Sequence, residues 1–313
     1  MTEDRDRKRR KVVFVTGVGH CGSTLLDLLL GSHSQGFSLG EWRSLHRAFA
    51  PGSSGRVSCG VCGEDCEFWN QEDRLSVLRR YFAGAGSRNW FSRRAYWFLA
   101  NYKLSIYREF FAWTGAIVLV DSGKSISWIA RQHRPAVRWR AVDPYLVFIH
   151  RDGRAVVNSY LRKYKQSRTT EDVVNFWVAE TRRIEDYYAH YDPERRFALA
   201  YEDLATSPAD IMQSVCAWLD IDFEPGMLDF WEHGHHIIGG NYGVRSQLVS
   251  GAKRVRNKPQ NESVHAQPAH SQHPAFTPSI RLDLRWKSEL GQERLATFEK
   301  IAGSANEPYA HDD

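Results

Sequence analysis

A glycine-rich segment near the start of the chain has the spacing of a phosphate-binding loop. Residues 17–24 read G-V-G-H-C-G-S-T, so Gly17 and Gly22 take the two glycine positions of the pattern G-x-x-x-x-G-K-[ST]. No lysine stands between Gly22 and the hydroxyl residues. Backbone N–H groups of the loop and the dipole of a following helix can surround an anion. Without the lysine, the loop is a poor clamp for β- and γ-phosphates. We therefore expect a single phosphate that carries another group.

A second polar cluster follows an apolar run in the middle of the chain. Residues 151–162 read R-D-G-R-A-V-V-N-S-Y-L-R. Arg151 stands where the apolar run ends, and Ser159 falls about two turns into the helix that the following residues predict. The pair can grip a second phosphate, separate from the one at the glycine loop.

The segments around these motifs predict the fold that must position them. Strands are predicted at residues 12–16, 37–39, 117–120, 145–149 and 197–201, and helices at 23–30, 72–113, 153–165, 171–190, 209–219 and 281–301. The aromatic residues of segment 72–113 are expected to form core. Alternating strands and helices predict an α/β fold with a P-loop-NTPase-like central parallel sheet flanked by helices, in a single domain. Such sheets bind ligands at the carboxyl ends of their strands, where both motifs fall.

Composition limits the class of protein. The chain has 313 residues and a net charge of +5, which fits anionic ligands, but it has no basic stripe with interleaved aromatic residues. We therefore expect no nucleic-acid partner. No apolar run is long enough to span a bilayer and no signal peptide opens the chain, which predicts a cytoplasmic protein without membrane insertion.

One domain is expected, with tails at both ends. Residues 1–10 form a basic N-terminal tail, residues 11–302 the α/β domain, and residues 303–313 a C-terminal tail. Within the domain, residues 250–280 are rich in His, Gln, Asn and Pro and predict a long, lid-like loop with a basic start.

Three of the five cysteines are clustered. Cys59, Cys62 and Cys66 lie in the stretch C-G-V-C-G-E-D-C, which can supply most of a zinc site. The fourth ligand is not evident, although His46 is near in sequence. We favour a tight structural loop with free thiols or one disulfide, and expect no metal.

Taken together, the motifs resemble those of the sulfotransferases that use 3′-phosphoadenosine 5′-phosphosulfate (PAPS). G-V-G-H-C-G-S-T-L is similar to their lysine-less loop for the 5′-phosphosulfate, and R-D-G-R-A-V-V-N-S-Y to their 3′-phosphate motif. Y-E-D-L at Tyr201, G-G-N-Y-G-V-R-S at 239–246 and D-L-R-W at 283–286 also look similar. Gly40-Glu41 and the Cys-Gly-rich loop ending in Phe-Trp resemble the carbohydrate, tyrosylprotein and bacterial small-molecule branch. The resemblance covers roughly residues 11–300.

The resemblance implies a co-substrate, an acceptor and a set of binding residues. The expected reaction moves the sulfuryl group of PAPS to a hydroxyl of a carbohydrate or of a small-molecule acceptor such as a phenol, and releases the 3′,5′-bisphosphate PAP, without requiring a metal. Arg43, His46 and Arg245 are expected to bind the acceptor or neutralise the sulfonate. PAPS is expected to contact Gly17, Gly19, His20, Cys21, Gly22, Ser23, Thr24, Arg151, Ser159, Tyr201, Arg254, Arg256 and Lys258.

The resemblance also implies catalytic roles. Glu41 matches the acidic position that serves as the base in the tyrosylprotein branch, and partial burial would raise its pKa usefully. His46, His20 and Asp121 are rival bases.

The chain departs from the family at His20, where Lys or Arg is usual. Either His20 is protonated beside the anion, or another cation replaces it. Lys124 is the best replacement, and it would stabilise charge on the leaving oxygen. Ser246 is expected to assist at the sulfonate.

Three other functions stay open from the residues alone. A P-loop kinase-like phosphotransferase would need ATP and magnesium. A catalytically weak nucleotide-binding protein would bind PAP without turnover. A zinc-stabilised interaction module would use the three-cysteine loop and have no affinity for nucleotide. The acceptor's identity and the oligomeric state are not readable from the sequence.

Overall fold

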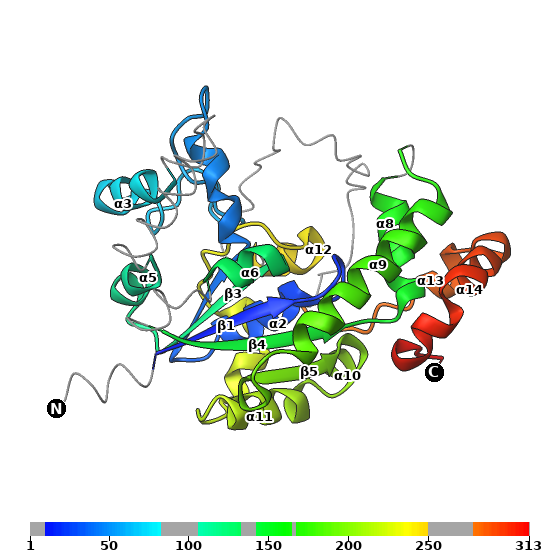
Figure 1. The fold of residues 1–313 in the computed structure, drawn as a ribbon. Helices are drawn as coiled ribbons and strands as arrows, with labels where there is room; N and C mark the ends of the chain where they lie inside the picture. Colours follow the sequence, from blue (N-terminus) through cyan, green and yellow to red (C-terminus); the bar gives the residue numbers. More distant parts are fainter. Residues whose placement is uncertain (1–9, 83–105, 133–141, 165–166, 250–277, 313) are drawn as a thin grey trace.

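The computed structural model describes residues 10–82, 106–132, 142–164, 167–249 and 278–312. Its centre is a parallel five-stranded sheet with the order β2-β3-β1-β4-β5 (Figure 1). The strands are β1 (Lys11–Thr16), β2 (Gly36–Gly40), β3 (Val118–Lys124), β4 (Asp143–His150) and β5 (Arg196–Ala200). The predicted fold class, an α/β fold around a central parallel sheet flanked by helices, is confirmed.

Helices connect and cover the strands. The α-helices are α2 (Ser23–Gly31), α3 (Glu72–Phe82), α5 (Ile106–Thr114), α6 (Ile126–Gln132), α8 (Gly153–Lys163), α9 (Thr170–Ala189), α10 (Tyr201–Thr206), α11 (Pro208–Trp218), α12 (Tyr242–Arg245), α13 (Trp286–Glu289) and α14 (Gln292–Asn306). The 3₁₀ helices are η1 (Trp42–Phe49), η2 (Pro193–Arg195), η3 (Pro225–Leu228), η4 (Phe230–Glu232), η5 (Ser246–Val249) and η6 (Glu307–Tyr309). Among the described residues, no helix is both long and apolar enough to cross a membrane.

The two faces of the sheet follow from the alternation of side chains along each strand. In β1, Val13 and Val15 pack into a core formed with α2, α10 and α11, whereas Val12 and Phe14 face a core formed with η1, α3 and α5. A third core lies between β4, α8, α9 and α14. Because both faces are covered, β1 is buried at every position, as its uninterrupted apolar run predicts.

The aromatic segment is core where the structure describes it. Tyr107, Phe110 and Phe111 of α5 are buried, and the rings of Tyr107 and Phe110 pack against Trp42 of η1. The aromatic residues at positions 90–102 fall outside the described residues.

The prediction for β3 was too short. The strand does not end at Val120 but continues to Lys124, and Asp121 and Ser122 are buried within it. Polar residues are tolerated there because each finds a partner: Ser122 Oγ donates to Asp27 Oδ2 over 2.6 Å, and Asp121 accepts four hydrogen bonds. The pairing of β1 with β3 shifts register between Phe14 and Thr16, which brings Thr16 opposite Lys124.

The expected C-terminal tail is also corrected. Helix α14 continues past residue 302 to Asn306, which is buried. The Asn306 side chain accepts a hydrogen bond from the Gly153 backbone N–H over 2.7 Å, at the start of α8. His311 N–H donates to the Asp152 carboxylate. The end of the described chain therefore packs against the β4–α8 junction.

A buried carboxylate of β3 joins three helices, η1, α5 and α6, to the sheet. Asp121 Oδ2 accepts from Trp42 Nε1 (2.8 Å), Tyr107 Oη (2.9 Å) and Trp128 Nε1 (2.9 Å). Its Oδ1 accepts from the Gly123 N–H over 2.9 Å. Burial raises the pKa of Asp121, and the four donors act in the opposite direction. With both carboxylate oxygens hydrogen-bonded and 1% of its surface exposed, Asp121 is unsuited to be the base, contrary to one of the alternatives above.

We expect Asp121→Asn to destabilise the fold. The amide replaces one acceptor oxygen with a donor, which leaves at least one buried donor unpaired at a cost of about 1–3 kcal/mol each. Urea unfolding should show a free energy of unfolding lower by roughly that amount. Asp186→Asn, at an exposed position of α9, is the matched control and should change it by less than about 0.5 kcal/mol. An unchanged urea midpoint for Asp121→Asn would contradict the role of this carboxylate.

Candidate active site

The glycine loop lies between the centre of the sheet and helix α2, as the motif requires. Gly22 caps α2 with a left-handed backbone, φ 96°, and a Cβ atom there would lie 2.4 Å from the Tyr201 ring. A Cβ atom at Gly19 would lie 2.3 Å from Tyr160 Oη of α8. Gly22 is required by its left-handed backbone and by the Tyr201 ring, whereas a side chain at Gly19 would have to displace the Tyr160 hydroxyl.

Three cationic side chains from separate elements act on the middle of this loop. Burial, together with the positive charges of Lys163, Lys124 and Arg151, lowers the pKa of His20 to about 4. At neutral pH, His20 is therefore uncharged in the unliganded protein. Two explanations were given above for a histidine at position 20, where Lys or Arg is usual. The structure favours the second, in which other cations supply the positive charge. The local potential is positive, which suits an anion.

Lys124 and Glu41 form an ion pair at the carboxyl ends of β3 and β2. Lys124 Nζ lies 2.6 Å from Glu41 Oε1 and 3.2 Å from Ser23 Oγ. Burial alone would raise the pKa of Glu41, but Lys124 and, to a smaller degree, Arg43 outweigh it and the pKa is lowered. The expectation of a raised pKa was wrong for the unliganded protein, because sequence spacing does not reveal a neighbouring ammonium group.

Arg151 is buried directly after β4. Its Nη1 donates to the His20 carbonyl over 3.2 Å, and its guanidinium lies 4.3 Å from the centre of the Tyr201 ring. Its Nη2 donates to the Asp283 carbonyl over 2.6 Å and lies 3.4 Å from the Asp283 carboxylate. Burial tends to raise the pKa of Asp283, but Arg285 and Arg151 hold it well below its usual range. Arg151 thus reaches the glycine loop and is paired with a carboxylate.

The other predicted residues lie at various distances from this centre. Thr24 Oγ1 accepts from the Asn241 N–H over 2.9 Å, and Cys21 is buried beneath the loop. Ser159 is half-buried on α8, one residue before the Tyr160 that packs on the loop. Arg254, Arg256 and Lys258 lie outside the described residues.

Among the expected acceptor-binding residues, Arg43 lies nearest to the pair. Arg43 Nε donates to the Gly123 carbonyl over 3.1 Å, and exposed His46 contacts the Arg43 carbonyl through Nδ1 over 2.8 Å. Arg245 donates to the Gly60 carbonyl over 2.7 Å. Exposed Ser246 donates to the Gly243 carbonyl. Arg245 thus contacts the cysteine loop, and Ser246 contacts its own segment. Neither of these two hydrogen bonds involves the glycine loop.

Three contributors were missed by sequence reasoning. Lys163 lies four residues after Ser159 on α8, and this helical spacing was a readable signal. Asp283 belongs to the D-L-R-W motif, but nothing in the sequence indicated its ion pair with Arg151. Residues 236–241 form a strap along the site: Glu41 N–H donates to the Ile238 carbonyl over 2.7 Å, and Asn241 reaches Thr24.

The cysteine loop packs under this strap. All five cysteines carry free thiols, and the fourth metal-ligating side chain near Cys59, Cys62 and Cys66 is His236. His46, the neighbour in sequence, is engaged with Arg43 instead.

Comparison with known proteins addresses the class of reaction. Residues 142–225, which contain Arg151, Ser159 and Lys163, match the model of the Sulfotransferase family. The resemblance read from the motifs is thereby confirmed, and it supports sulfuryl transfer as the general reaction. No curated protein sequence matches the chain.

Solved structures of sulfotransferases are also similar in fold. The sulfotransferase domain from the curacin biosynthetic pathway has a TM-score of 0.48 and 18% identity, over 75% of this chain and 82% of its own. The sulfotransferase domain from the Synechococcus PCC 7002 olefin synthase has a TM-score of 0.49 and 16% identity, over 94% of both chains. A sulfotransferase from Mycobacterium tuberculosis H37Rv has a TM-score of 0.40 and 16% identity, over 73% of this chain and 72% of its own. With TM-scores below 0.5, the reaction class rests on the family match.

We expect Lys124→Met to destabilise the protein in a pH-dependent way. The lowered pKa of Glu41 means that the ionised pair stabilises the folded state above the unfolded-state value of 4.5. This stabilisation is lost as the pH falls through the lower folded-state pKa. Urea unfolding should therefore separate wild type from Lys124→Met at neutral pH, and the difference should shrink below about pH 4. Lys300→Met, exposed on α14, is the control. A difference that does not depend on pH would contradict the assignment.

Proposed function

We propose that this protein transfers the sulfuryl group of PAPS to a hydroxyl of a small-molecule or carbohydrate acceptor and releases PAP. The observation that carries the proposal is that three cations, Lys163, Lys124 and Arg151, act on His20 within a lysine-less glycine loop that ends at the N-cap of α2. Two cationic positions on either side of one loop suit a nucleotide with two separate anionic groups. The family match of residues 142–225 supplies the reaction class.

The 5′-phosphosulfate is assigned to the glycine loop. The backbone N–H groups at the start of α2 and the hydroxyls of Ser23 and Thr24 are the donors there. Lys124 Nζ, already 3.2 Å from Ser23 Oγ, is the cation nearest to these donors. Lys124 therefore takes the part that a lysine within the loop plays in nucleotide triphosphatases.

The 3′-phosphate is assigned to Arg151, Ser159 and Lys163. Ser159 and Lys163 share one face of α8, and Arg151 emerges from β4 beside the start of that helix. In the unliganded protein, Asp283 is the counter-ion of Arg151. A phosphate must share or displace this carboxylate, so nucleotide binding is expected to rearrange residues 281–285. Arg254, Arg256 and Lys258, which lie outside the described residues, stay part of this proposal as further contributors.

Glu41 is assigned as the base and Lys124 as the group that stabilises the leaving oxygen. The acceptor oxygen attacks sulfur, the bond between sulfur and the bridging phosphate oxygen breaks, and the acceptor proton passes to Glu41. The two residues are paired before the donor binds. When Lys124 turns to the bridging oxygen, Glu41 loses its counter-ion, and its burial then raises its pKa toward the value a base needs. The ion pair thus couples donor binding to activation of the base.

Calorimetric titration with PAP and with AMP tests the donor site. We expect PAP to bind and AMP, which lacks the 3′-phosphate, to bind much more weakly. Arg151→Ala should weaken PAP binding roughly 10- to 100-fold, the worth of one charge-assisted hydrogen bond, and leave AMP binding nearly unchanged. Arg182→Ala, exposed on α9, is the matched control and should bind PAP like wild type. Equal affinity for PAP and AMP would remove the basis for PAPS as the donor.

Turnover tests the base. With radiolabelled PAPS and a panel of phenolic and sugar hydroxyl acceptors, Glu41→Gln should lower kcat by roughly 10²- to 10⁴-fold while PAP affinity stays within a few-fold. Glu299→Gln, exposed on α14, should retain the wild-type rate. Full activity of Glu41→Gln would transfer the role of base to another group, and His46→Ala would then be the next variant. PAP binding without turnover by any acceptor would favour a nucleotide-binding protein instead.

A further inference from the structure

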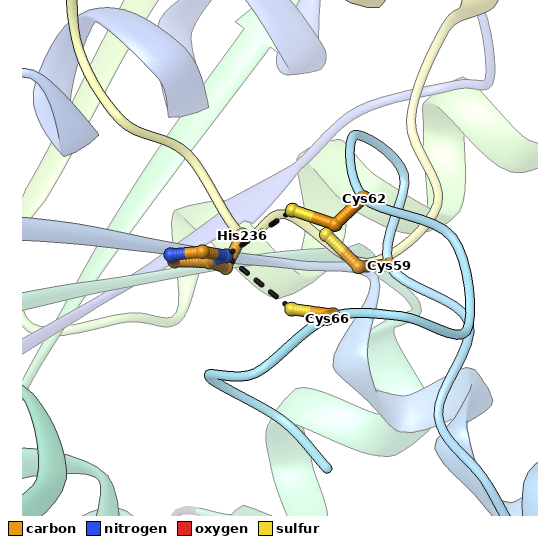
Figure 2. Close-up of side chains that lie close together, drawn as sticks. All are labelled: Cys59, Cys62, Cys66 and His236. Atoms are coloured by element: carbon orange, nitrogen blue, oxygen red, sulfur yellow. Dashed lines mark hydrogen bonds between the residues drawn. The ribbon is translucent and has the colours of Figure 1, made fainter. Parts of the chain in front are cut away.

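Four side chains that commonly bind metal converge beside the strap, from segments about 170 residues apart in the sequence. They are Cys59, Cys62, Cys66 and His236, whose ligating atoms all lie within 4.8 Å of one another (Figure 2). His236 Nδ1 lies 3.6 Å from Cys62 Sγ and 3.3 Å from Cys66 Sγ. Figure 2 shows the three thiols and the imidazole nitrogen pointing toward a common centre.

The cysteine loop has a backbone that orients its sulfur atoms. Cys59 and Gly63 exchange two backbone hydrogen bonds of 2.9 Å, and Gly63 has a left-handed backbone, φ 66°. The Val61 N–H lies 3.4 Å from Cys59 Sγ and donates to it. An N–H donor to sulfur stabilises a thiolate more than a thiol. The loop thus forms a tight turn with its sulfur atoms on the inside.

His236 is held in place by groups other than the cysteines. Its ring stacks on Phe68, with ring centres 5.0 Å apart and an interplanar angle of 11°. Its carbonyl accepts from Trp69 Nε1 over 2.5 Å. The preceding His235 is buried and points elsewhere, to the Phe230 carbonyl and Ser32 Oγ. Only His236 of this pair therefore presents its Nδ1 to the sulfur atoms.

We propose that these residues bind one Zn²⁺ ion in a closed, tetrahedral Cys₃His site. Zinc–ligand bonds of about 2.3 Å to sulfur and 2.0 Å to nitrogen place the ligands of a tetrahedral site about 3.6–3.8 Å apart. The two nitrogen–sulfur distances already lie near this range. Three thiolates and one imidazole complete the four positions, so the site is structural and takes no part in sulfuryl transfer. Thiolate and imidazole ligands in this geometry favour zinc over magnesium or calcium.

The surroundings fit the charge of such a site. Three thiolates and Zn²⁺ carry a net charge of about −1. Arg245 donates to the Gly60 carbonyl inside the cysteine loop over 2.7 Å, and the Arg74 guanidinium lies 4.3 Å from the centre of the Phe68 ring that stacks on His236. Both cations can offset this charge. Arg245 was expected to bind the acceptor, and in the structure its guanidinium contacts the cysteine loop.

The ion would attach the strap to the cysteine loop beside the site. The Gly60 N–H donates to the Ile237 carbonyl over 2.7 Å, so cysteine loop and strap are also paired by backbone next to His236. The carbonyl of Ile238, the residue after Ile237, accepts a hydrogen bond from the Glu41 N–H. A Cβ atom at Gly239 would lie 3.2 Å from Glu41 Cβ. Loss of the ion should therefore loosen residues 236–241 and, with them, the position of Glu41.

The metal content of the purified full-length chain tests the proposal directly. We expect about one zinc ion per chain by elemental analysis, released by a strong chelator with a fall in Tm and restored by zinc. Cobalt substitution of the wild-type protein should give the intense sulfur-to-cobalt and ligand-field bands of a tetrahedral thiolate site. Hydrogen exchange should show lower protection of residues 237–241 in the metal-free protein.

Variants separate the cluster from other thiols and imidazoles. Cys66→Ser and His236→Ala should lower bound zinc to a small fraction of the wild-type content. Cys216→Ala, a buried cysteine outside the cluster, and His46→Ala should keep it. If Cys66→Ser does not fold, the cobalt spectra of the wild-type protein still test whether cysteine thiolates bind the metal ion. The proposal is overturned if protein made with added zinc contains less than about 0.1 ion per chain and gives no thiolate–cobalt bands. Because it needs no nucleotide, this outcome is independent of the PAPS assignment.

Discussion

The buried carboxylate of Asp121 determines where the proposed catalytic pair lies. It binds the indole of Trp42, which is the next residue after Glu41, and the N–H of Gly123, which is the residue before Lys124. The same carboxylate binds Tyr107 and Trp128 and so joins α5 and α6 to the edge of the sheet. A carboxylate that is buried away from water must be hydrogen-bonded, and this requirement draws η1, α5, α6 and β3 to one point. Glu41 and Lys124 then emerge at neighbouring strand ends within hydrogen-bonding distance.

Charge is arranged around the glycine loop in a way that differs from nucleotide triphosphatases. The residue within the loop, His20, is half-buried and neutral, and the positive charge comes from Lys124, Arg151 and Lys163 elsewhere in the chain. Two of these cations are already paired with carboxylates, Lys124 with Glu41 and Arg151 with Asp283. In the absence of a ligand, each carboxylate neutralises its cation. The same carboxylate then competes with an anionic ligand for that cation. Under the proposed function, both pairs exchange partners when PAPS binds.

The strap of residues 236–241 connects the two sites proposed here. At one end, His236 faces the three cysteines, and at the other, Asn241 donates to Thr24 of the glycine loop. In between, Ile238 pairs with β2 at Gly40 and binds the Glu41 N–H. A strap without regular secondary structure has few hydrogen bonds of its own, so its conformation depends on anchors at its ends. A structural ion at the cysteine loop would be one such anchor.

The sequence by itself determined the elements and the position of both anion-binding motifs. Apolar β-branched runs and glycine spacing are local properties, and parallel strands bring their carboxyl ends to one edge whatever the detailed packing. Only the tertiary structure decided which groups meet. The direction of the pKa shift of Glu41, the counter-ion of Arg151 and the choice of His236 over His46 beside the cysteines depend on distances of a few ångströms between segments 80 to 170 residues apart. Electrostatic and ligand interactions decay over such distances, and residue spacing along the chain carries no information about them.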